Sequence, residues 1–135
     1  MRLGIGLVAV LLAVAAAPVA AQRPLPGRYQ GSTQFIQVSD NGVSDGELGL
    51  SLAITGPDSA LTGKLTLRSA DGTPFPATLT GTRGRDGHFQ LRGEALGLQI
   101  ELEGVPDGGA AIFGHLAVSQ GGDPFVAGSW RATRQ

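Results

Sequence analysis

Two histidines are the side chains in this 135-residue chain best suited to acid–base or metal chemistry. His88 follows the turn signal Asp86-Gly87, and His115 falls in the outward phase of a later strand. We expect both to face solvent, on strands that are not neighbours in a meander. Because the chain has no cysteine to complete a ligand set, the sequence predicts no shared zinc site.

Oxygen-bearing side chains gather between residues 40 and 47, where Asp40, Asp45 and Glu47 occur together. Calcium takes six to eight oxygen ligands, but the spacing does not match the helix-flanked calcium loop. Asn41-Gly42 is a turn signal. We therefore predict an acidic connection between two strands and no metal.

Nucleophilic and general acid–base catalysis lack the combinations that they require. No serine occupies a Gly-x-Ser-x-Gly elbow with a histidine to serve it. Glu101 and Glu103 are expected on the exposed face of one strand, whereas acid–base pairs need a shielded pocket. We predict no catalytic residue, no cofactor and no enzymatic activity.

The elements that position these residues are indicated by an apolar-x-Gly triplet that recurs six times after residue 60. Strand side chains alternate with period two, so the apolar residue and the glycine of each triplet share the inward face. Inward glycines let strands bend and approach each other, as a small closing sheet requires. The triplets begin at Leu61, Leu79, Leu91, Leu102, Ile112 and Val126.

Turn dipeptides separate short alternating segments, a pattern typical of all-β barrels and sandwiches. The predicted fold is a small eight-stranded antiparallel up-and-down β-barrel, with a two-sheet sandwich as the alternative. Similar aromatic triplets at the two ends of the sheet predict that Tyr29 and Trp130 are core neighbours at the barrel seam. The predicted strands are 28–38, 47–55, 60–68, 74–83, 88–94, 97–104, 110–119 and 125–133.

Leu61-Thr62-Gly63 and Leu79-Thr80-Gly81, in a meander opened by Gly27-Arg28-Tyr29, resemble the avidin-type barrels and, more distantly, the lipocalins. The resemblance implies a calycin-like or avidin-like architecture. Avidins stack several tryptophans around biotin, and this chain has one tryptophan. The resemblance therefore implies no biotin site.

Residues 1–21 are typical of a cleaved secretory signal peptide, with Arg2, an apolar run and small residues before the expected cleavage after Ala21. A Pro-rich lead-in at 22–27 and a single barrel domain at 28–135 are predicted to follow. We expect a soluble, disulfide-free protein that is secreted or periplasmic, without a membrane span in the mature chain. An outer-membrane barrel is a weaker alternative, because aromatic residues make up only 5% of the chain, too few for the aromatic girdles of such barrels. Scattered basic residues argue against nucleic acid as a partner.

The function predicted from these features is binding, in one of two forms. In the first, the barrel holds a small apolar ligand among its aromatic side chains, with room left by Gly63, Gly81 and Gly93. The alternative for this interior is a core filled by its own side chains, with the glycines serving curvature. The predicted ligand-binding residues are Tyr29, Phe35, Phe75, Phe89 and Trp130.

In the second form, the outer surface binds another exported protein, as inhibitor barrels do. Aromatic side chains on a wet face favour this interpretation. The predicted partner-binding residues are Phe113, His115 and Phe125, together with the loop 120–124.

Overall fold

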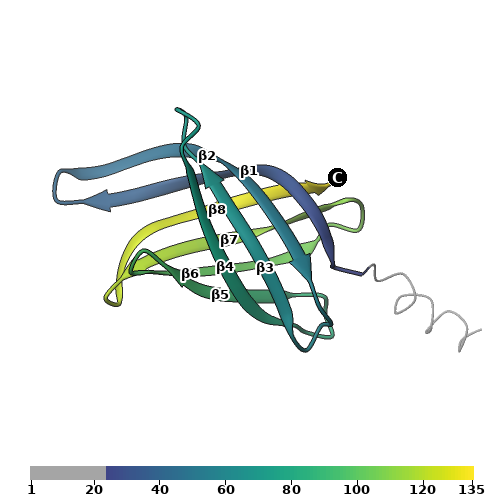
Figure 1. The fold of residues 1–135 in the computed structure, drawn as a ribbon. Helices are drawn as coiled ribbons and strands as arrows, with labels where there is room; N and C mark the ends of the chain where they lie inside the picture. Colours follow the sequence, from purple (N-terminus) through teal and green to yellow (C-terminus); the bar gives the residue numbers. More distant parts are fainter. Residues whose placement is uncertain (1–23) are drawn as a thin grey trace, which may run out of the picture.

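Eight antiparallel strands close into a barrel in the computed structural model, which describes residues 24–135 (Figure 1). Each strand pairs with the next one along the chain, and β8 pairs with β1. The predicted barrel is thus confirmed and the sandwich is excluded. The strands are β1 (Gly27–Ser39), β2 (Gly42–Thr55), β3 (Leu61–Arg68), β4 (Pro74–Arg83), β5 (Phe89–Ala95), β6 (Leu98–Pro106), β7 (Ala111–Gln120) and β8 (Asp123–Arg134).

The largest difference from the predicted strands lies at the start of β2. Residues 42–46 were predicted to lie outside the strands, but they belong to β2 and pair with β1 from Ser39↔Gly42 onward. Only Asp40 and Asn41 remain as a turn. The prediction was wrong because a strand without a covered face carries no apolar alternation, and its Gly, Ser and Asp composition resembles that of a loop.

The barrel interior is filled by leucine, isoleucine and aromatic side chains from every second position of the strands. The inward glycines do not leave room. A Cβ built on Gly63 would lie 2.7 Å from Leu91 Cδ1, and one on Gly81 would lie 1.7 Å from the carbonyl oxygen of Gln90. The expectation that Gly63, Gly81 and Gly93 make space for a ligand is therefore wrong. These positions let neighbouring strands and side chains approach closely.

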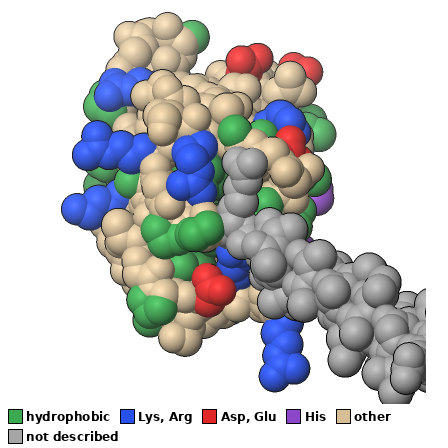
Figure 2. All heavy atoms as spheres, turned by 90° about the vertical axis from the view of Figure 1, so that its right-hand side faces the viewer, with side chains coloured by type: hydrophobic (Ala, Val, Ile, Leu, Met, Phe, Trp, Pro, Cys, Tyr) green, Lys and Arg blue, Asp and Glu red, His purple; other side chains and the backbone are tan. Residues whose placement is uncertain are grey.

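One end of the barrel, here called the terminal end, is sealed by the residues that enter and leave the sheet. Leu25 is buried, and its carbonyl oxygen accepts a hydrogen bond of 2.6 Å from the hydroxyl of Tyr29. Arg134 donates to the carbonyl oxygens of Pro24 and Pro26 and to the Tyr29 hydroxyl. Burial raises the pKa of Tyr29 above its ordinary value. Figure 2 shows this end, with Lys and Arg side chains spread over its surface.

The seam between β1 and β8 closes as the matching chain ends predict, but at a different register. Trp130 lies opposite Thr33, whereas Tyr29 lies opposite Arg134. The two aromatic residues therefore occupy different levels of the seam. Trp130 instead packs against Phe89, with ring centroids 6.2 Å apart.

The predicted signal peptide at 1–21 lies outside the described residues, as does the start of the lead-in. Within residues 24–135 no helix is long and apolar enough to cross a membrane.

Candidate functional site

The two ends of the barrel differ in how well they cover their apolar side chains. At the terminal end Leu25, Tyr29, Phe89 and Ile112 are almost completely buried. At the opposite end, where the projecting β1–β2 hairpin begins and which we call the hairpin end, the apolar side chains are only partly covered. The members of this apolar rim are Leu48, Phe75, Ala95, Leu98, Phe125 and Val126.

Phe125 belongs to the rim because of a bulge in β8. Val118 pairs with Val126 and Ser119 pairs with Pro124, so Phe125 is an extra residue without a partner on β7. A bulge changes the direction of side chains, and here Phe125 packs against the core. The expectation that Phe125 lies on the wet outer face is wrong, since strict alternation cannot anticipate a bulge.

The five predicted ligand-binding aromatics fall into two groups. Phe75 lies in the rim, and Phe35 lies at the same end, half-buried over Gly46. Tyr29, Phe89 and Trp130 are buried toward the terminal end, where side chains already fill the interior. The structure does not bring the five together around one cavity.

The tight turn between β5 and β6 adds an exposed apolar residue at the hairpin end. Leu96 is 86% exposed and has a φ of 53°, and it is followed by Gly97 at φ 78°. A left-handed leucine is unfavourable by roughly 1–2 kcal/mol. A two-residue hairpin turn explains the left-handed conformation at position 96, but it does not explain why an exposed leucine occupies this position beside the rim residues Ala95 and Leu98.

The outer wall carries a second cluster, which joins β6 and β7 to the turn that precedes β5. Glu103 of β6 lies between the two histidines: its Oε2 is 2.9 Å from His88 Nε2, and its Oε1 is 2.9 Å from His115 Nδ1. Asp86 accepts a hydrogen bond from the backbone N–H of His88 and so fixes the turn that presents this ring. The hydrogen bond from His88, and to a smaller extent the one from His115, holds the pKa of Glu103 below its ordinary value.

The cluster borders a groove of about 230 Å³ on the outer face of β5, β6 and β7. Arg92 and Glu101 both line this groove and lie opposite each other on β5 and β6, with Nε and Oε1 3.6 Å apart. His115 and Glu103 remain 75% and 38% exposed. The charges are thus paired and in water, which suits a solvated wall better than proton transfer in a shielded pocket. Among residues 24–135 no group of three or more metal-binding side chains could hold an ion.

Sequence reasoning placed His88 and His115 on the surface but did not connect them. His88 immediately precedes β5 and His115 lies on β7; these strands are not neighbours, as expected, yet β6 between them supplies Glu103. The sequence could have indicated this link, because the alternation of β6 places Glu103 on the outer face between the two histidines.

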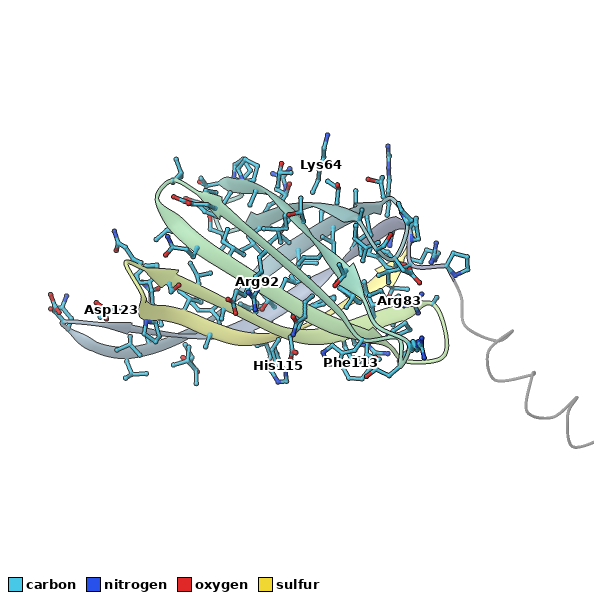
Figure 3. The ribbon with its side chains drawn as sticks, turned by 90° about the horizontal axis from the view of Figure 1, so that it is seen from below. Lys64, Arg83, Arg92, Phe113, His115 and Asp123 are labelled. Carbon is cyan, nitrogen blue, oxygen red and sulfur yellow. The ribbon has the colours of Figure 1, made fainter. Side chains whose placement is uncertain are left out.

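Phe113 and His115 project from the same outer face of β7 (Figure 3). Phe113 is 40% exposed, and the guanidinium of Arg131 lies 6.0 Å from its ring centroid. Arg131 is also paired with Asp107 at 2.6 Å. Of the predicted partner-binding residues, the structure places Phe113 and His115 together on the outer wall and Phe125 elsewhere.

Comparisons with known proteins support the architecture. No protein-family model matches the chain, and no curated protein matches it either. A solved structure described as "Structure of EF1p2_mFAP2b bound to DFHBI" matches with a TM-score of 0.61 and 13% identity, over 82% of this chain and 94% of that one. At this identity the likeness shows a shared barrel fold.

Proposed function

We propose that this protein is a binding module that takes a small apolar ligand at the hairpin end of its barrel. The observation that carries the proposal is the apolar rim: every partly buried hydrophobic side chain packed against the described core lies at that end. Incompletely covered apolar side chains that gather at one end of the barrel favour a ligand that covers them.

The rim, rather than the deep interior, is the part of the barrel suited to a ligand. Below it the positions that glycine might have left open are occupied, as Gly63 and Gly93 show by their contacts with Leu91 and Leu79. A ligand that covers about 200 Å² of apolar surface gains about 5 kcal/mol before the cost of association. Rim side chains such as Phe75 and Leu98 supply such surface.

A solved structure with a similar fold supports the proposal, because it is described as bound to a small molecule. EF1p2_mFAP2b is bound to DFHBI and shares this barrel architecture. We infer the same general use of the fold here, with the ligand chosen by the apolar side chains of this chain.

The experiment compares two phenylalanine-to-serine variants. Phe75→Ser removes a rim side chain, and Phe113→Ser removes an aromatic of the outer wall as the matched control. Binding of Nile red and of DFHBI is measured by fluorescence titration, and circular dichroism confirms that both variants fold. We expect dye binding to the natural protein, at least about tenfold weaker binding to Phe75→Ser, and unchanged binding to Phe113→Ser.

Should Phe75→Ser unfold, the milder Leu98→Gln variant carries the comparison. Equal dye binding by the natural protein and by both rim variants, or no binding by the natural protein, overturns the proposal.

A second candidate function is protein binding through the outer wall, and exposed Phe113 favours it. If Phe113→Ser abolishes association with an exported protein while dye binding persists, the wall is a partner site. We infer that either function is non-catalytic. We also infer that the protein acts after export, because residues 1–21 match a signal peptide. N-terminal sequencing of the recovered protein tests export, with Gln22 expected as the first residue.

A further inference from the structure

The β1–β2 hairpin extends past the closed part of the barrel and projects from it (Figure 1). β8 pairs with β1 only as far as Gln37, and β3 pairs with β2 only from Gly49 onward. The segment Gly42–Leu48 therefore has β1 on one side and no strand on the other. We call this segment the β2 edge.

Backbone groups along the β2 edge are available to another strand. In an antiparallel pair, alternate residues direct their N–H and C=O groups away from the partner. Among residues 24–135 no backbone hydrogen bond outside the strand pairings engages this segment, apart from a 3.4 Å contact of the Ser39 hydroxyl with the Gly42 carbonyl.

The first half of β4 is also without a neighbouring strand on one side, but unlike the β2 edge it is protected against the addition of another strand. β5 pairs with β4 only from Leu79 onward, and the uncovered part of β4 contains Pro74 and Pro76. Proline lacks the N–H that strand addition needs. The β2 edge contains no proline.

Side chains on the outer face of the hairpin are apolar and acidic. Ile36, Val38 and Val43 are 54%, 56% and 71% exposed, and Val38 lies directly opposite Val43. Residues 34–47 contain three acidic side chains (Asp40, Asp45 and Glu47) and no Lys, Arg or His. None of these carboxylates has an ion-pair partner among the described residues.

A groove of about 640 Å³ lies at the base of the hairpin, where it meets β8. Gln34, Ile36, Asp45, Glu47 and Ser129 are among the residues that line it. The groove thus places two unpaired carboxylates and an exposed isoleucine beside the open backbone edge.

We propose that the β2 edge binds an extended segment of a partner protein that alternates basic and apolar side chains, which adds to the sheet as a further strand. Strand addition obtains affinity from main-chain hydrogen bonds and specificity from alternate side chains. Because strand side chains alternate between faces, basic residues would lie beside Asp45 and Glu47 on the outer face, and apolar residues would lie beside Leu48 on the inner face. A second copy of this chain fits less well, because pairing of two such edges sets like charges against each other.

The test uses a fluorescein-labelled peptide that alternates Lys and Val, with a Glu–Val peptide as its counterpart. Anisotropy measures binding to the natural protein, to the double variant Asp45→Lys/Glu47→Lys, and to the control Glu94→Lys on the exposed face of β5. We expect the Lys–Val peptide to bind, the double variant to lose at least about tenfold in affinity, and the control to match the natural protein. Hydrogen exchange should slow at alternate amides of residues 42–48 when the peptide is present.

Three results would overturn the proposal. These are equal affinity for both peptides, affinity unchanged in the double variant, and amide protection outside the β2 edge. Concentration-dependent dimerisation in analytical ultracentrifugation, abolished by peptide, would assign the edge to a second copy instead. The site lies apart from Phe75, so loss of dye binding in Phe75→Ser leaves this result unaffected, and each proposal fails separately.

Discussion

The indole Nε1 of Trp130 lies 3.0 Å from the carbonyl oxygen of Glu103 and 3.1 Å from that of His115. One buried N–H therefore ties together the backbones of the two strands whose side chains form an ion pair on the outer wall. Glycine makes this approach feasible: a Cβ on Gly104 would lie 2.6 Å from the Trp130 ring, and one on Gly114 would lie 1.9 Å from the Glu103 carbonyl oxygen.

Replacing Trp130 with Phe should lower the free energy of unfolding by about 1–3 kcal/mol, because two buried carbonyl groups lose their shared donor. Urea unfolding followed by circular dichroism measures the change. Phe113→Leu, on the exposed face of the neighbouring strand, should change stability by less than about 0.5 kcal/mol. Equal losses in the two variants would contradict a structural role for the indole N–H.

Glu103→Gln should alter how stability depends on pH in the acid range. The pKa of Glu103 is lowered in the folded protein by hydrogen bonds from His88 and His115. Its stabilising contribution is therefore present above the unfolded-state pKa of about 4.3 and is lost as the pH falls through the lower folded-state pKa. Urea unfolding from pH 7 downward should show a shallower acid loss in Glu103→Gln than in the natural protein. Glu94→Gln should retain the natural acid loss, and a profile unchanged in both variants would contradict the role of the cluster.

Leu96→Asn should raise stability by about 1 kcal/mol, since Asn tolerates the left-handed conformation and Asn-Gly is a preferred two-residue hairpin turn. Leu96→Ala keeps the unfavourable conformation and serves as the control, with little change expected. Thermal unfolding measures both variants. If Leu96 also helps to cover a ligand, the Asn variant should bind Nile red more weakly although it is more stable.

Gly63→Ala should destabilise the protein by about 1–3 kcal/mol, because its new methyl group would lie 2.7 Å from Leu91 in a filled core. Gly49→Ala, on the outward face of the adjacent strand, meets its nearest atom at 3.6 Å and should be neutral or stabilising. Chemical denaturation compares the two. Stabilisation by Gly63→Ala would instead indicate an empty space inside the barrel.

The strand pattern was predictable because each covered strand must alternate apolar and polar side chains. Leu48, Leu50, Leu52 and Ile54 indicate the covered part of β2 without ambiguity. Residues 42–46 gave no such signal, because no second layer covers them and their polar and acidic composition suits an exposed edge. Closure was predictable from the glycine triplets, whereas the level at which Tyr29 and Trp130 cross the seam depends on register.

The candidate sites were less predictable because they depend on contacts between strands. The link between His88 and His115 through Glu103 requires the register of β5, β6 and β7, which the turn lengths set. The inward position of Phe125 requires a bulge that no residue type announces. The exposure of the rim depends on how well each end of the barrel is covered. At the terminal end the cover includes Leu25, whose burial could not be predicted from a Pro-rich lead-in.

The most direct test of the ligand proposal is a native mass spectrum of the protein taken gently from the cells that produce it. The rim predicts additional mass that leaves on denaturation and is reduced in Phe75→Ser but not in Phe113→Ser. The bare chain mass in every variant, together with no dye binding by the natural protein, would contradict a ligand-binding barrel.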